Sequence, residues 1–160
     1  RFESRGLGDV YKRQERGMSE AIAKNLSVLS NLKTKIIVII TGEGGSGGAL
    51  AIGVGDHICM LEYSIYAVAS PEACASIVWR DKSKANEAAK AMKVDADSLI
   101  KFGLIDEIIT EPLGGAHRDL GGACNLISNS IEKNLIHLNN QDIEEILKKR
   151  YEKIMSYGLV

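Results

Sequence analysis

The chain has 160 residues, of which 45% are hydrophobic and 26% charged, and its 20 basic residues nearly balance 21 acidic ones. This length and composition fit one globular domain and exclude a disordered chain, a coiled coil and a small disulfide-stapled scaffold. The net charge of −1 offers no basic surface for nucleic acid, and the longest apolar run, IIVII at 36–40, is far shorter than the ~20 residues that span a membrane.

The cysteines point to a reducing compartment. There are three, Cys59, Cys74 and Cys124, and none forms a Cys-x-x-Cys spacing. An odd number without that spacing favours the cytoplasm and argues against a structural zinc site. We therefore expect a cytoplasmic protein with no metal site in this chain, whose cysteines are small buried apolar residues.

The first residues differ from the rest of the chain. Residues 1–14 (RFESRGLGDVYKRQ) have neither helical nor alternating periodicity and no apolar segment typical of a targeting peptide. We interpret 1–14 as a non-native or disordered leader and 15–160 as the folded part.

Helices and strands alternate along residues 15–160. A helix is expected from Ser19, a possible N-cap, because Ile22, Leu26, Leu29 and Leu32 recur at helical spacing. In chain order, the sequence then predicts a strand at 35–41, a short helix at 49–52, strands at 56–61 and 64–69, helices at 71–79, 83–92 and 95–103, a strand at 104–110, a loop at 111–119, and helices at 122–137 and 141–157. The run at 148–150 (KKR) is expected on a solvated face.

This order predicts an α/β domain. The strands on either side of residues 62–63 are too closely joined for a parallel crossover, so the chain is not a uniform β-α-β winding. No internal sequence repeat is visible.

Five of the sixteen glycines lie at 42–48 (GEGGSGG), and this segment permits several interpretations. Gly42-x-Gly44-x-x-Gly47 satisfies the dinucleotide-binding pattern, but only 15 positions separate the flanking strands, too few for a crossover helix. Gly44-x-Ser46-x-Gly48 satisfies the nucleophile-elbow pattern, which requires an acid and a histidine base as partners. The glycines could also serve only a tight turn and close packing.

A further interpretation uses the backbone. Glycines that enter a helix leave N–H groups free at the positive end of its dipole, where they can bind an oxyanion. The amides of Gly47 and Gly48 are the expected donors.

Several blocks of the sequence occur together in one family. They are GEGGSGGALAIGVGD (42–56), LEYSIY (61–66), SPEACASIVW (70–79), EPLGGAHR (111–118) and RYEKIMSYG (150–158). With them, residues 15–160 resemble the carboxyltransferase α subunit of bacterial-type acetyl-CoA carboxylase.

The resemblance implies a partial crotonase-like (ClpP/crotonase) superhelix of strand-strand-helix units followed by C-terminal helices. It also implies transfer of a carboxyl group from carboxybiotin, carried on a separate carrier protein, to acetyl-CoA, which gives malonyl-CoA for fatty-acid synthesis. The implied partners are a β subunit in an α2β2 assembly, the biotin carboxyl carrier protein and biotin carboxylase. Zinc would belong to the β subunit.

By the same resemblance, Gly47 and Gly48 form an oxyanion hole that faces biotin. Gly44, Gly45, Ser46, Ser64 and Tyr66 are expected to line the biotin or substrate pocket. His117 and Arg118 lie on a glycine-containing loop, where they could contact the carrier or a phosphate, or only hold the loop.

The sequence departs from the family in two ways. Ala73 replaces the usual glycine after Ser-Pro-Glu, and the family's α subunit extends upstream of Glu15. We expect residues 15–160 to be the C-terminal half of the subunit and to have little activity alone. The alternatives are a crotonase-like acyl-CoA hydratase or hydrolase, and a non-catalytic module that assembles with the β subunit.

Overall fold

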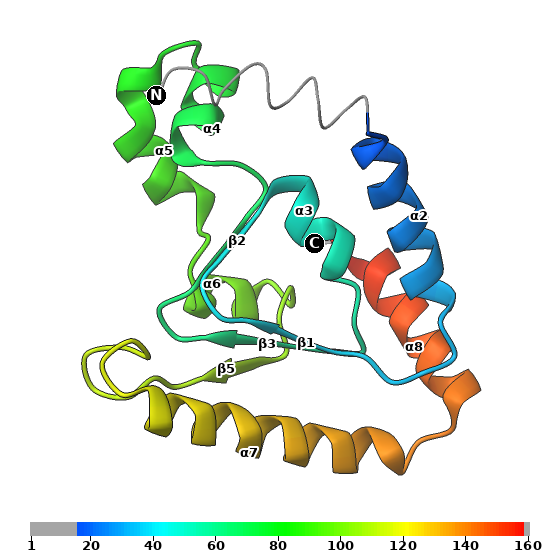
Figure 1. Ribbon diagram of the computed structural model, residues 1–160. Helices are drawn as coiled ribbons and strands as arrows, with labels where there is room; N and C mark the ends of the chain where they lie inside the picture. The colour runs from blue at the N-terminus through cyan, green and yellow to red at the C-terminus, as the bar shows by residue number, and fades with distance from the viewer. Residues whose placement is uncertain (1–15, 159–160) are drawn as a thin grey trace.

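A computed structural model describes residues 16–158, so the interpretation of residues 1–14 lies outside the described part. Two strand-strand-helix units follow each other along the chain (Figure 1). The first consists of β1 (Ile37–Ile40), β2 (Glu43–Gly45) and α3 (Ser46–Ile52), and the second of β3 (His57–Leu61), β4 (Ile65–Ala67) and α4 (Pro71–Val78).

Equivalent strands of the two units pair in parallel. β1 pairs with β3, β2 pairs with β4, and β5 (Glu107–Ile109) joins the first sheet in the order β1-β3-β5. The strand-strand-helix prediction is thereby confirmed, and β3 and β4 lie in different sheets. The connection from β1 to β3 does cross over in parallel, because β2 adds its length to the short helix α3.

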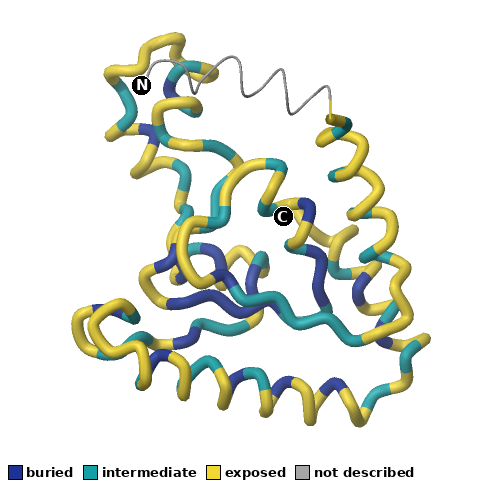
Figure 2. The backbone as a smooth tube through the Cα atoms, in the orientation of Figure 1, coloured by how far each residue is buried: buried dark blue, intermediate teal, exposed yellow. Residues whose placement is uncertain are grey.

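The three-stranded sheet is covered on both faces. Because side chains alternate along a strand, Ile58 and Met60 face α6 (Ala96–Lys101), whereas Cys59 and Leu61 face α7 (Leu120–Asn139). Figure 2 shows burial concentrated along this sheet and on one side of α7. The apolar side chains on the two faces of this sheet form the two layers of the core. Full burial of one such side chain contributes about 1.5–3 kcal/mol to stability.

Local capping signals set several helix boundaries as the sequence predicts. Ser70 accepts a hydrogen bond from the Ala73 amide at the start of α4, and Asp95 accepts one from the Ser98 amide at the start of α6. The region predicted as one helix at 83–92 is η2 (Lys82–Lys84) followed by α5 (Ala85–Met92). The expected cap at Ser19 is wrong, because α2 (Met18–Asn31) begins after Gly17, whose φ of 74° makes the turn.

Arg150 on α8 (Ile143–Ser156) joins distant parts of the chain. The residue is 1% exposed, and its guanidinium donates to both carboxylate oxygens of Asp56, at 2.7 and 2.9 Å. It also donates to the carbonyl oxygens of Leu29, Leu32 and Thr34 at 2.7–3.0 Å. We call Arg150 with these four partners the Arg150 latch.

Two expectations about side-chain exposure need correction. Lys148 and Lys149 are solvated, but Arg150 in the same run is buried, because it lies on the side of α8 that also buries Ile146. Only Cys59 among the cysteines is fully buried, and Cys124 is exposed on the outer side of α7. Within residues 16–158, no helix combines the length and apolar character needed to cross a bilayer.

Candidate functional site

The glycine-rich segment forms the sharp junction between β2 and α3. Gly45 is extended (φ −136°, ψ 146°), and Ser46 takes a left-handed φ of 56°, after which the chain becomes helical. The first amides of a helix have no acceptor inside it. Among the described residues, the amides of Gly47 and Gly48 donate no hydrogen bond to an acceptor in a turn, a loop, a helix cap or a side chain. These two amides are therefore available to a ligand.

The glycines around this junction fall into two groups. A Cβ on Gly44 would lie 2.9 Å from the Tyr66 ring, and a Cβ on Gly53 would overlap the Tyr66 hydroxyl, so packing explains both. A Cβ on Gly45 or Gly48 would meet no atom within 4 Å. Packing therefore does not explain why these two residues lack side chains, whereas the approach of a ligand to the backbone would.

Tyr66 lies at the centre of this region and lines three hollows. The largest, about 560 Å³, lies between α2, α3 and α8, and Tyr157 also lines it. The other two, of about 460 and 330 Å³, lie on either side of the β2–α3 junction. Burial raises the pKa of Tyr66, and burial with the nearby charge of Asp106 raises the pKa of Tyr157 to about 12. Both hydroxyls are therefore neutral hydrogen-bonding groups at neutral pH.

The predicted site residues do not all lie together: those of the glycine-rich segment line two hollows, and Ser64 lies elsewhere. Gly44, Gly45 and Gly48 line the 460 Å³ hollow, and Ser46 and Gly47 line the 330 Å³ hollow. The two glycines that carry the expected oxyanion donors thus line neighbouring hollows that share Tyr66.

Ser64 lines neither hollow of the β2–α3 junction. It is 5% exposed in the turn between β3 and β4, where its amide donates to the Leu61 carbonyl at 3.0 Å. Its position is that of a packing residue.

The geometry disfavours the two side-chain interpretations of the segment. The left-handed φ of Ser46 fits a nucleophile elbow, but the described residues that line its hollow include no histidine and no carboxylate. Gly42 of the dinucleotide pattern precedes β2 and Gly44 lies within β2, so these two glycines are not in the turn from strand to helix, where a dinucleotide site has them.

Glu111 organises the loop at 111–119, and the sequence analysis did not single it out. Its carboxylate accepts hydrogen bonds from the amides of Tyr63 at 3.0 Å and Ala116 at 2.7 Å. The loop is thereby tied to the turn between β3 and β4. His117 and Arg118 are exposed on this loop and do not line the hollows around Tyr66. A signal was available, because an acid that precedes Pro and two glycines is typical of an anchored turn.

Comparison with known proteins decides the family. The model of the family described as "Acetyl co-enzyme A carboxylase carboxyltransferase-like" matches residues 9–158. The chain belongs to this family. It is 54% identical over 145 residues to the acetyl-coenzyme A carboxylase carboxyl transferase subunit alpha of Tolumonas auensis, and 56% over 146 residues to that of Pseudomonas fluorescens. Each match covers 91% of this chain and 46% of the relative, so the chain spans about half the length of these relatives.

Solved structures support the fold class. A Pseudomonas malonate decarboxylase hetero-tetramer in complex with malonate has a TM-score of 0.63 at 19% identity, over 86% of this chain and 54% of that one. The hetero-tetramer in complex with coenzyme A has a TM-score of 0.55 at 21% identity, over 80% and 62%. At these identities the likeness concerns the fold alone, and it confirms the expected crotonase-like α/β class.

Proposed function

We propose that this chain is part of the α subunit of a biotin-dependent carboxyltransferase that transfers a carboxyl group to acetyl-CoA and forms malonyl-CoA. The observation that carries the proposal is the 54–56% identity to carboxyl transferase α subunits over nearly the whole described chain. In this role the protein acts in the cytoplasm, in the first committed step of fatty-acid biosynthesis.

The β2–α3 junction is the proposed reaction site. Its bare Gly45 and Gly48 backbone fits a planar ring that approaches closely, since no atom lies within 4 Å of where a Cβ would stand. When bound there, carboxybiotin supplies the carboxyl group. The amides of Gly47 and Gly48 donate hydrogen bonds to the oxygen on which negative charge develops, and Gly44, Gly45, Ser46 and Tyr66 form the surrounding walls. Such preorganised donors stabilise a transition state because they need no rearrangement.

The same proposal requires partners. The β subunit would assemble with this subunit as α2β2 and provide the second oxyanion hole and a zinc ribbon. The biotin carboxyl carrier protein would deliver carboxybiotin, and biotin carboxylase would load it in an ATP-dependent step.

Substitution of Gly48 tests the site. Gly48→Ala places a methyl group in open space and favours the helix, so the fold should be kept. The variant is built into an α subunit of the relatives' full length and assembled with the β subunit. The variant keeps the Gly48 amide, but its methyl group stands between that amide and the approaching ligand. We expect biotin-dependent malonyl-CoA decarboxylation to fall, by as much as the ~10²–10³-fold that loss of an oxyanion-hole donor costs, and Gly48→Val to lose at least as much.

The matched control is Gly121→Ala at the start of α7, where the added Cβ meets only Asp119 Oδ1 at 3.7 Å. It should leave turnover unchanged. Undiminished turnover of Gly48→Val would remove the proposed oxyanion site. Turnover of an acyl-CoA without biotin would instead indicate a hydratase or hydrolase, and binding of the β subunit without turnover would indicate an assembly module.

A further inference from the structure

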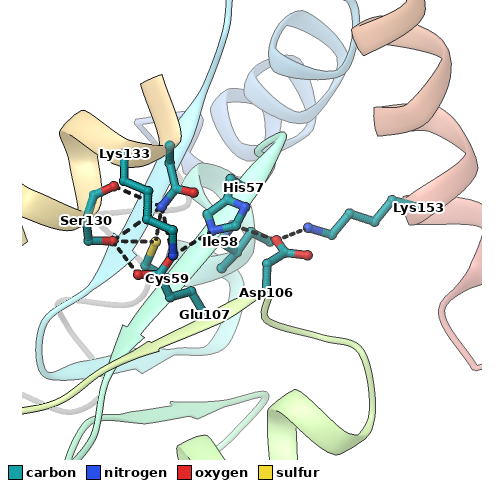
Figure 3. A network of polar contacts seen from close by, with 9 residues as sticks. His57, Ile58, Cys59, Asp106, Glu107, Ser130, Lys133 and Lys153 are labelled. Carbon is teal, nitrogen blue, oxygen red and sulfur yellow. Dashed lines mark hydrogen bonds and ion pairs between the residues drawn. The ribbon is translucent and has the colours of Figure 1, made fainter. Parts of the chain in front are cut away.

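Three side chains with metal-binding atoms converge on the face of the sheet that α7 covers (Figure 3). His57 and Cys59 are two residues apart on β3, so they point to the same face. Glu107 on β5 is the register partner of Cys59, which places it beside them. A ring nitrogen of His57, Sγ of Cys59 and a carboxylate oxygen of Glu107 all lie within 4.8 Å of one another.

This cluster lies on the face of the sheet opposite to Tyr66 and is independent of the proposed carboxyltransferase site. Tyr66 packs against the core layer that contains Ile58 and Met60, whereas Cys59 belongs to the layer under α7. Cys59 is fully buried, but the side chains of His57 and Glu107 are 22% and 20% exposed. A cation therefore has a route to the cluster from solvent.

One polar contact at the cluster, the ion pair between Lys133 and Glu107, is one that a cation could replace. Glu107 accepts hydrogen bonds from Ser130 and Asn134 at 2.9 Å, and Lys133 Nζ lies 3.4 Å from its carboxylate. The Lys133 side chain is 72% exposed, and such an ion pair contributes little stability. Among residues 16–158, the polar contacts of Cys59 Sγ are long, 3.6 Å to Ser130 Oγ and 3.9 Å to Asn134 Nδ2.

We propose that His57, Cys59 and Glu107 form a zinc-binding site that ties β3 to β5. Imidazole, thiolate and carboxylate are the ligands that Zn²⁺ uses in proteins, at about 2.0–2.3 Å, which sets ligand atoms about 3.3–3.8 Å apart. His57 Nε2 and Glu107 Oε2 are already 3.3 Å apart, and Sγ of Cys59, which lies within 4.8 Å of both ligand groups, would have to approach by up to about 1 Å. On binding, the thiol releases its proton to solvent, the sulfur–metal bond forms, and Lys133 leaves Glu107. The fourth position remains open to a water molecule.

Cobalt provides the test, because a thiolate bound to Co²⁺ gives an intense near-ultraviolet charge-transfer band. We expect the 160-residue chain at neutral pH to show this band at one equivalent of Co²⁺ and to lose it when Zn²⁺ is added. Cys59→Ser should abolish the band. The matched controls Cys74→Ser and Cys124→Ser should keep it, since neither residue belongs to the cluster.

Two more variants separate ligation from folding. His57→Gln changes a partly exposed side chain, and it should keep the far-ultraviolet circular dichroism of the parent. It should weaken Zn²⁺ binding by more than the ~10–100-fold that loss of a group hydrogen-bonded to a ligand already costs, because it removes a direct ligand. Lys133→Met should strengthen Zn²⁺ binding, because it removes the cation that competes for Glu107. Absence of the charge-transfer band in the folded parent, or its persistence in Cys59→Ser, would show that the cluster is only a hydrogen-bonded network.

Discussion

At the scale of single residues, Arg150 makes the strongest stability prediction. Arg150→Met would leave the buried Asp56 carboxylate without its counter-charge and would take one hydrogen-bond donor from each of three carbonyl groups. We expect the free energy of unfolding, measured by urea denaturation, to fall by about 3–5 kcal/mol, the usual cost of breaking a buried ion pair from one side.

The neighbouring lysine supplies the control. Lys149 is 56% exposed and pairs with Glu145 one helical turn away, so Lys149→Met should change the free energy of unfolding by no more than about 0.5 kcal/mol. If both substitutions lowered the free energy of unfolding by similar amounts, the burial of Arg150 would not be what makes it stabilising.

Residue-scale features were the hardest to predict from the sequence. Arg150 follows two solvated lysines and looks like them, although helical spacing from Ile143 and Ile146 places it on the inward side of α8. The His57–Cys59–Glu107 cluster joins residues 50 positions apart in the chain, and only the pairing of β3 with β5 brings them together. The expectation of no metal site depended on local spacing, which cannot show such a cluster.

At the scale of elements, the cap of α6 predicts a pH dependence. Hydrogen bonds from the hydroxyl and then the amide of Ser98 hold the pKa of Asp95 below its ordinary value of 3.8. Because the pKa is lower in the folded state, the ionised cap stabilises the fold above pH 3.8, and this contribution is lost as the pH falls through the lowered pKa.

Substitution at Asp95 measures this contribution. Asp95→Ala should cost about 1 kcal/mol at neutral pH, the usual value for an N-cap. Its difference from the parent in urea denaturation should shrink as the pH falls below 3.8. Ser98→Ala should reproduce part of the effect, because it removes one of the two donors. A difference that stays constant with pH would contradict the role of the charge.

Helices that begin with a side-chain cap were predictable from the sequence, whereas a strand that forms only by pairing with another strand was not. Ser70-Pro71 and Asp95 mark the starts of α4 and α6 by side-chain caps, which the sequence displays directly. Strand β2 is formed by Glu-Gly-Gly, a composition with no strand preference. It exists because β4 pairs with it, so the sequence predicted a loop at this point and began α3 three residues late.

At the scale of the whole molecule, the α4–α5 pair is set apart from the central sheet (Figure 1). These two helices bury only Ala75 and Ala88, both small, while Ile77 and Val78 are exposed. We expect amide hydrogens of residues 71–92 to exchange by local opening long before those of β3, as hydrogen-exchange mass spectrometry can measure. Equal protection of both regions would contradict this view.

The architecture of the whole molecule was predictable only through the resemblance. No sequence repeat links residues 37–52 to 57–78, yet both form the same strand-strand-helix unit. Thr41 and Gly42 connect β1 to β2, whereas residues 62–64 (EYS) connect β3 to β4, so similar backbone paths arise from dissimilar residues. The family blocks identified the fold because they mark these turns, whereas hydrophobic periodicity alone indicated only an α/β domain.

The Arg150 latch has a kinetic consequence. Its hydrogen bonds connect positions 94 to 121 residues apart, and contacts of such long range close only after much chain entropy has been lost. We expect the latch to form after the rate-limiting barrier, so that its removal accelerates unfolding and leaves refolding nearly unchanged. The latch would then determine the lifetime of the native state rather than the speed at which that state is reached.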